Sequence, residues 1–260
     1  MRLLVGRVGL GAAVSAIYAG AAWAEPVQLD RASVGAKVCS WSGLGGKVSF
    51  GLRTDILDAA LDQARKAAQT DPSAAEGVRL LEGIQLRGSY DVTTGVVLVD
   101  VTASEPASSS VRQSGFEQVK HGIYQMVAGA FQSLDGHRAS IFPPGPQLTA
   151  NPVDGLLVVQ LPAGAATAEL GLDPATLLPT TLTLPVQGGA IRLDYTGWQP
   201  DPGRDCAWLT RIETTTTGGP HSVMTIAYQD LGKERFLRSV DLTVGGQHGG
   251  RIELLEPKVE

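Results

Sequence analysis

The chain has few of the residues that build catalytic and metal sites. Only two cysteines and four histidines occur among its 260 residues. No two histidines stand three or four residues apart and no HExxH segment occurs, which argues against a zinc hydrolase. A GxSxG nucleophile elbow and an aspartic-protease Asp-Thr-Gly are missing too. The sequence therefore predicts no enzyme, no metal site and no cofactor. A hydrolase remains an alternative if two polar groups from distant strands converge in a cleft.

A basic surplus is also missing. The net charge is −5 and no stripe of lysine and arginine is present, which argues against nucleic acid as a partner. The segment Gly43–Gly46 is glycine-rich, but no Gly-Lys-Ser or Gly-Lys-Thr follows it, so it is not a phosphate loop.

The apolar run at the start of the chain is too short for a typical membrane span. Residues 8–22 are apolar or small and follow two arginines, and Ala22-Trp23-Ala24 has the small-x-small form of a cleavage site. This is the pattern of a secretory signal peptide over residues 1–24. A retained membrane anchor is the alternative, although a span needs ~20 apolar residues. Arginine outnumbers lysine and Asn151 is the only asparagine, a bias typical of GC-rich bacteria. We therefore expect a soluble protein of the bacterial periplasm, with residues 25–260 as a single domain.

The two cysteines, Cys39 and Cys206, both lie in the exported part. In an oxidising compartment they most simply form one disulfide bond. A free buried thiol and a reactive nucleophile are the alternatives.

The first part of the chain predicts two short strands, a helix and a hairpin. Residues 25–46 are expected to be irregular, with 33–41 as a short strand, and 47–52 as a second strand. A helix is expected from Thr54 to the Asp71-Pro72 stop, with its apolar residues on one face. Period-two alternation predicts a strand over 84–92, a turn at 93–95 and an apolar strand over 96–101 that should lie centrally. Residues 105–110 are expected to form a lid-like connection.

A second helix is expected over 114–134. Ser114 and Glu117 form a capping box, an apolar stripe follows, and Gly136 stands where a helix commonly ends. Gly122 and Gly129 lie at one edge of the stripe. They indicate either a core helix in close backbone contact, or a movable helix over an apolar cavity.

The second half of the chain predicts an antiparallel meander. Residues 141–152 are proline-rich and are expected to be irregular. Short strands separated by Gly- and Pro-containing turns then follow one another without helices, which is typical of an antiparallel sheet. The expected strands are 155–161, 166–170, 180–184, 190–196, 208–216, 221–228, 237–244 and 251–255.

The order of these elements resembles the periplasmic lipoprotein-carrier superfamily of LolA/LolB-type half-barrels. The resemblance rests on the helix at 54–69 leading into Ile84–Tyr90, on the Leu172-Asp-Pro-Ala-Thr-Leu-Leu-Pro179 turn, and on the strand Ile191–Tyr195. It implies an α+β fold: a strongly curved antiparallel β-sheet, a half-barrel of roughly ten or more strands, with two or more α-helices packed against its concave face. It also implies an apolar cavity for acyl chains.

The leading functional prediction is a carrier for a lipid, an acyl chain or another hydrophobic ligand. The residues expected to line its cavity are Ile123, Met126, Val127, Phe131, Tyr195 and Trp208. The aromatic residues of the late strands could instead be ordinary core. The alternative function is a structural or assembly module of the cell envelope that binds another envelope protein.

Overall fold

The computed structural model describes residues 25–104, 110–135, 147–164 and 166–260. The expected signal peptide (1–24), most of the lid-like connection and Gly136 lie outside the described residues. Within the described part, no helix has the length and hydropathy of a membrane-spanning segment.

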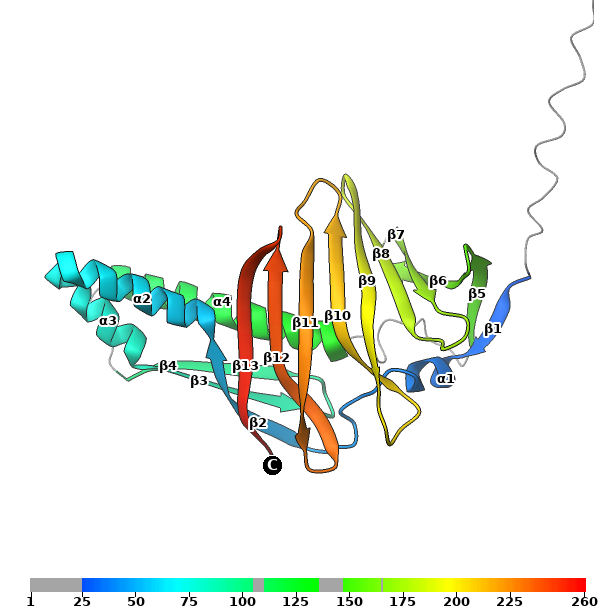
Figure 1. Cartoon of the computed structure of the whole chain (residues 1–260), viewed down its shortest axis with the longest axis horizontal. Coiled ribbons are helices and arrows are strands. Elements are labelled where there is room, and N and C mark those ends of the chain that lie inside the picture. The colour runs from blue at the N-terminus through cyan, green and yellow to red at the C-terminus, as the bar shows by residue number, and fades with distance from the viewer. Residues whose placement is uncertain (1–24, 105–109, 136–146, 165) are drawn as a thin grey trace, which may run out of the picture.

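Thirteen strands make up the sheet. They are β1 (Val27–Asp30), β2 (Lys47–Thr54), β3 (Ile84–Asp91), β4 (Val97–Ala103), β5 (Gln147–Val153), β6 (Leu156–Ala163), β7 (Ala166–Leu172), β8 (Pro179–Val186), β9 (Gly189–Pro200), β10 (Ala207–Thr216), β11 (Ser222–Leu231), β12 (Glu234–Val244) and β13 (Gln247–Val259). All form one antiparallel sheet in the order β1-β5-β6-β7-β8-β9-β10-β11-β12-β13-β2-β3-β4 (Figure 1). The α+β class and the meander from β5 to β13 are therefore confirmed.

The last strand of the meander pairs with an early strand. Leu254 of β13 lies opposite Leu52 of β2, and Ile252 lies opposite Thr54. This pairing extends the meander by β2, β3 and β4, and it joins both parts of the chain into one sheet.

The position of β4 corrects one prediction. The apolar run at 96–101 was expected to form a central strand, but β4 is last in the sheet order and pairs with β3. Val97 and Val101 are buried, whereas Leu98 is 59% exposed on the other face. The apolar composition of this segment was therefore no evidence that both faces of the strand are covered. The position of a strand in a sheet depends on its pairing with segments far away in the chain.

Two further predictions of irregular or extended structure are wrong. Residues 33–41 do not form a strand, because α1 (Arg31–Ala36) includes the first four of them. Asp30 caps α1 and accepts hydrogen bonds from Ser33 N and Oγ. Residues 147–152, expected to be irregular, belong to β5, and β5 pairs with both β1 and β6.

The helix at Thr54 is confirmed. It is α2 (Asp55–Thr70), and Thr54 Oγ1 accepts a hydrogen bond from Ile56 N. A short 3-10 turn, η1 (Pro72–Ala74), and a helix that sequence analysis missed, α3 (Ala75–Glu82), follow before β3. The long helix, α4 (Ser110–Asp135), begins four residues before the expected capping box, so Ser114 lies inside the helix and is not its N-cap.

The C-terminal half of α4 is anchored in an aromatic cluster. The Phe131 ring lies 5.0 Å from Tyr90, 5.7 Å from Phe50 and 5.6 Å from Trp41. Phe236 of β12 closes the cluster. These contacts place α4 across the face of β2, β3 and β12 that carries these rings, here called the inner face; in Figure 1 the helix lies behind β10 to β13.

The disulfide prediction is confirmed. Cys39 and Cys206 are bonded, with an S–S distance of 2.00 Å across a sequence separation of 167. Backbone hydrogen bonds from Cys39 N to Ala207 O and from Ala207 N to Lys37 O flank the bond. The segment after α1 is thereby fixed to the start of β10.

Candidate functional site

Four of the six residues predicted to line a cavity lie together on α4. Ile123, Val127 and Phe131 are 3%, 1% and 1% exposed, and Met126 beside them is partly buried against the core. The helix thus presents one continuous apolar face to the inner side of the sheet.

The other two predicted residues lie on the meander. Trp208 packs against Tyr228 at a ring distance of 4.8 Å, and Tyr195 lies 6.4 Å from Trp198. Burial raises the pKa of both tyrosines above its ordinary value. Tyr195 and Trp208 are thus core residues, 4% and 2% exposed, in aromatic pairs separate from the cluster around Phe131.

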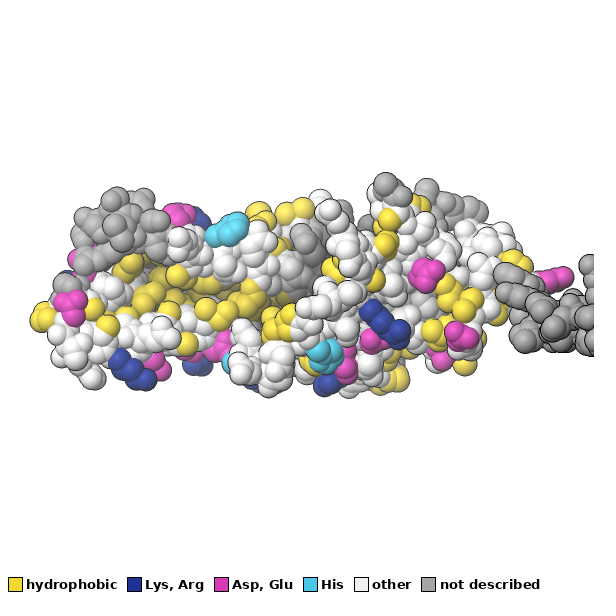
Figure 2. Space-filling model, turned by 90° about the horizontal axis from the view of Figure 1, so that it is seen from above, with side chains coloured by type: hydrophobic (Ala, Val, Ile, Leu, Met, Phe, Trp, Pro, Cys, Tyr) yellow, Lys and Arg dark blue, Asp and Glu magenta, His cyan; other side chains and the backbone are white. Residues whose placement is uncertain are grey.

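A hollow lined by hydrophobic side chains lies over the half of the molecule that carries α2, α3 and the first part of α4 (Figure 2). None of the 16 residues of α2 is buried. Its apolar face, with Leu57, Ala60 and Leu61, is only half-covered, and Ile56 is 45% exposed. On α4, Phe116 and Val119 are likewise only partly buried. Both helices therefore keep apolar surface that the protein itself does not cover.

The glycines of α4 do not mark a close helix contact. A Cβ atom added at Gly122 or Gly129 would meet no atom within 4 Å outside the neighbouring helix backbone. The interpretation that these glycines permit close backbone packing is therefore wrong for the described residues. The movable-helix interpretation stays a prediction.

A groove of about 520 Å³ runs beside the start of α2. Asp55 on α2 and His248 on β13 meet at this groove, where Asp55 Oδ2 is hydrogen-bonded to His248 Nε2. Asp55 Oδ1 accepts a second bond, of 2.7 Å, from Arg251 N. Burial works against ionisation of Asp55, yet these two hydrogen bonds and the His248 charge leave its pKa below the ordinary value. Sequence reasoning missed this pair because 193 residues separate its members.

The other residues that line this groove are mostly apolar or small. They are Ile56, Ala59, Ala60, Gln63, Gly249 and Gly250. None carries a hydroxyl or thiol, so the lining supplies no protein nucleophile beside the Asp55–His248 pair.

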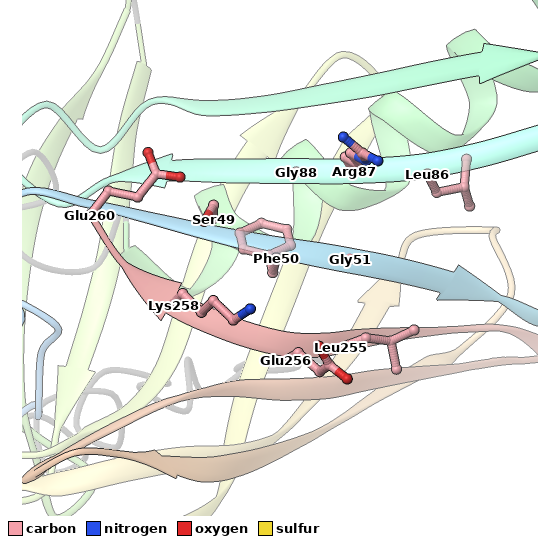
Figure 3. Close-up of a pocket in the computed structure, with 10 residues that line it drawn as sticks. All are labelled: Ser49, Phe50, Gly51, Leu86, Arg87, Gly88, Leu255, Glu256, Lys258 and Glu260. Atoms are coloured by element: carbon pink, nitrogen blue, oxygen red, sulfur yellow. The ribbon is translucent and has the colours of Figure 1, made fainter.

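A second groove, of about 700 Å³, lies over β2, β3 and β13 (Figure 3). The β13–β2 ladder is interrupted between Leu255 and Lys258, and Glu256 has a positive φ of 46°. The groove combines Arg87 and Lys258 with Glu256 and Glu260, so its charges are balanced. Pro257 was a sequence signal for this interruption, because proline inside a strand marks an edge or a bulge.

In comparisons with known proteins, no family model, no curated protein and no solved structure matches this chain. Among the described residues, no group of three or more histidine, cysteine, aspartate or glutamate side chains is arranged to hold a metal ion.

Proposed function

We propose that this protein is a soluble carrier of the bacterial periplasm that binds the acyl chain of a lipid or lipoprotein. The acyl chain lies in the hollow over α2, α3 and α4. The observation that carries this proposal is the hydrophobic lining of the hollow in Figure 2, formed by helices that leave their apolar faces half-covered. The signal peptide at 1–24 exports the chain, and the Cys39–Cys206 bond suits an oxidising compartment.

An acyl chain fits this surface better than a polar ligand does. Each methylene group that leaves water contributes about 0.8 kcal/mol, so a long chain supplies its binding free energy without any specific polar partner. Half-covered residues such as Leu57 on α2 and Met126 on α4 also lose contact with water when the acyl chain binds, and this adds to the binding free energy. Met126 has an unbranched, polarizable side chain that adapts to ligands of different shape.

The carrier architecture we propose is a half-barrel. The sheet curves, and its concave side, the inner face, holds α4 and the ligand. The likeness to lipoprotein carriers supports this architecture through the Leu172–Pro179 turn, which connects β7 and β8. There Asp173 Oδ1 accepts hydrogen bonds from Ala175 N and Thr176 N, and the turn carries Leu177 at a positive φ of 59°.

A carboxylate on the apolar face of α4 tests the proposal. Met126→Asp is expected to weaken binding of a fluorescent fatty acid about a hundredfold, because a buried unpaired charge opposes the apolar ligand. Binding is measured by fluorescence titration, and retention of the fold by circular dichroism.

The matched control is Gln125→Asp. Gln125 is the preceding residue of α4 and is exposed, so the same charge added there leaves binding unchanged. Equal affinity of the two variants would remove α4 from the site. Native mass spectrometry of protein purified from the periplasm is expected to show a bound hydrophobic molecule. A ligand-free protein that also binds no fatty-acid probe would overturn the carrier proposal.

A further inference from the structure

We propose that the groove beside α2 is a hydrolytic site for carboxylic esters with an apolar acyl group, in which His248 acts as the general base on water. This activity is distinct from acyl-chain carriage. The groove shares Ile56 and Ala60 with the uncovered apolar surface of α2, but its chemistry depends on His248 and Asp55, which the carrier proposal does not use. The activity rests on a paired histidine and carboxylate, a groove that holds a small ester, and an interrupted ladder at the same place.

The His248–Asp55 pair has the arrangement that a general base needs. Asp55 is held by the Arg251 backbone N–H as well as by His248, so its carboxylate is fixed in place. A fixed carboxylate on one ring nitrogen orients the imidazole and stabilises the imidazolium that forms during proton transfer. The side chain of His248 is 61% exposed, so its other ring nitrogen is accessible to water and substrate.

The surroundings select the substrate class. Ile56, Ala59 and Ala60 offer an apolar wall to an acyl group, and the groove volume of about 520 Å³ is in the range of small-ligand sites. Glycine at position 250 keeps this wall close to the strand, because an added Cβ would lie 3.1 Å from Ile56 Cδ1.

The β12–β13 ladder is irregular beside His248. The β12–β13 ladder pairs Leu242 with Gly250 and Thr243 with His248, so Gly249 has no partner residue. Such bulges leave one residue out of the ladder and are frequent next to active sites.

The reaction balances without a cofactor. His248 accepts a proton from water while the water oxygen bonds to the ester carbonyl carbon, giving a tetrahedral intermediate. The bond from that carbon to the alcohol oxygen then breaks, and the imidazolium returns the proton to the departing alcohol. The groove lining contains no hydroxyl or thiol, so the proposed reaction uses water as its nucleophile.

The experiment measures hydrolysis of p-nitrophenyl butyrate by the full chain. His248→Ala is expected to lower kcat about a hundredfold or more, the usual contribution of a general base. Free imidazole is expected to restore part of that loss, because it occupies the space left by the side chain. Asp55→Asn tests the positioning residue and is expected to lower kcat with KM unchanged.

His221→Ala is the matched control. His221, the residue before β11, forms a similar pair with Glu213 of β10 at 3.2 Å, outside the groove, and its loss is expected to leave the rate unchanged. Equal rates for wild type, His248→Ala and His221→Ala would overturn the inference. So would a His248→Ala defect that imidazole does not relieve. Fatty-acid binding, measured separately, distinguishes either result from failure of the carrier proposal.

Discussion

At the scale of single residues, Asp201 in the β9–β10 turn accepts several hydrogen bonds. Its Oδ2 accepts hydrogen bonds from Trp208 Nε1 at 2.8 Å and from Arg204 at 3.1 Å, and its Oδ1 accepts one from Gly203 N. Arg204 continues to Glu234 at 2.8 Å on β12 and lies over the Trp208 ring. Asp201 therefore holds the Trp208 indole, and Arg204 connects the turn beside Cys206 to β12.

Asp201 makes the free energy of unfolding depend on pH. The hydrogen bond from Trp208, with those from Gly203 and Arg204, lowers the pKa of Asp201 from 3.8 to about 2. Because the folded-state pKa lies below the unfolded one, this stabilisation is present above pH 3.8 and is lost as the pH falls towards 2. Asp201→Asn is expected to lower the free energy of unfolding by about 2 kcal/mol at neutral pH and to flatten its decline in that acidic window. Urea unfolding at several pH values measures both effects.

The control for this prediction is Asp205→Asn in the same turn. Its side chain is 93% exposed and pairs with Lys37, so a change below about 1 kcal/mol is expected. Identical pH profiles for Asp201→Asn and wild type would contradict the role given to Asp201.

At the scale of elements, the helices differ in how firmly they are packed. The second half of α4 is held by Phe131 in the aromatic cluster, whereas α2 and α3 contain no buried residue. Earlier along α4, Phe116 and Val119 are only partly buried, and Gly122 has open space around its Cα among the described residues. The apolar surface that the protein leaves uncovered thus lies on the helices with the fewest buried residues.

Gly122→Ala is expected to stabilise the protein by about 1 kcal/mol. The added methyl group meets no neighbouring atom, while alanine favours the helix over glycine by about that amount. The thermal midpoint measures the change. Gly88→Ala on β3 is the opposed case, because its Cβ would collide with the ring of buried Phe50, and it is expected to destabilise. A destabilised Gly122→Ala variant would restore the close-packing interpretation of this helix.

At the scale of the whole molecule, two connections close the fold. The β13–β2 pairing makes one sheet from both parts of the chain, and the Cys39–Cys206 bond ties the N-terminal segment to β10. Since the thirteen strands share one sheet, we expect unfolding in a single cooperative transition.

Removal of the disulfide bond is expected to lower the free energy of unfolding by about 5 kcal/mol. The bond spans 167 residues, and the chain-entropy model assigns that stabilisation to a loop of this length. Urea unfolding of the Cys39→Ala/Cys206→Ala double variant measures the loss, with oxidised wild type as reference. A loss below about 1 kcal/mol would contradict the loop-entropy account for this protein.

The sequence by itself determined the elements whose signals are local. The Thr54 cap and Asp71-Pro72 stop defined α2, and the Gly- and Pro-containing turns defined most of the meander. The disulfide followed because only Cys39 and Cys206 were available. Local hydrogen bonds and turn geometry involve residues close together in the chain, so they can be predicted from the sequence of a short segment.

Only the tertiary structure decided which distant segments meet. It placed β4 at the sheet edge, joined β13 to β2, and brought Asp55 to His248 and Arg204 to Glu234. These contacts depend on strand order and on packing between residues far apart in the chain, which no window of neighbouring residues encodes. Both proposed sites depend on such contacts, which is why the sequence predicted apolar residues on α4 but neither the hollow nor the groove with its Asp55–His248 pair.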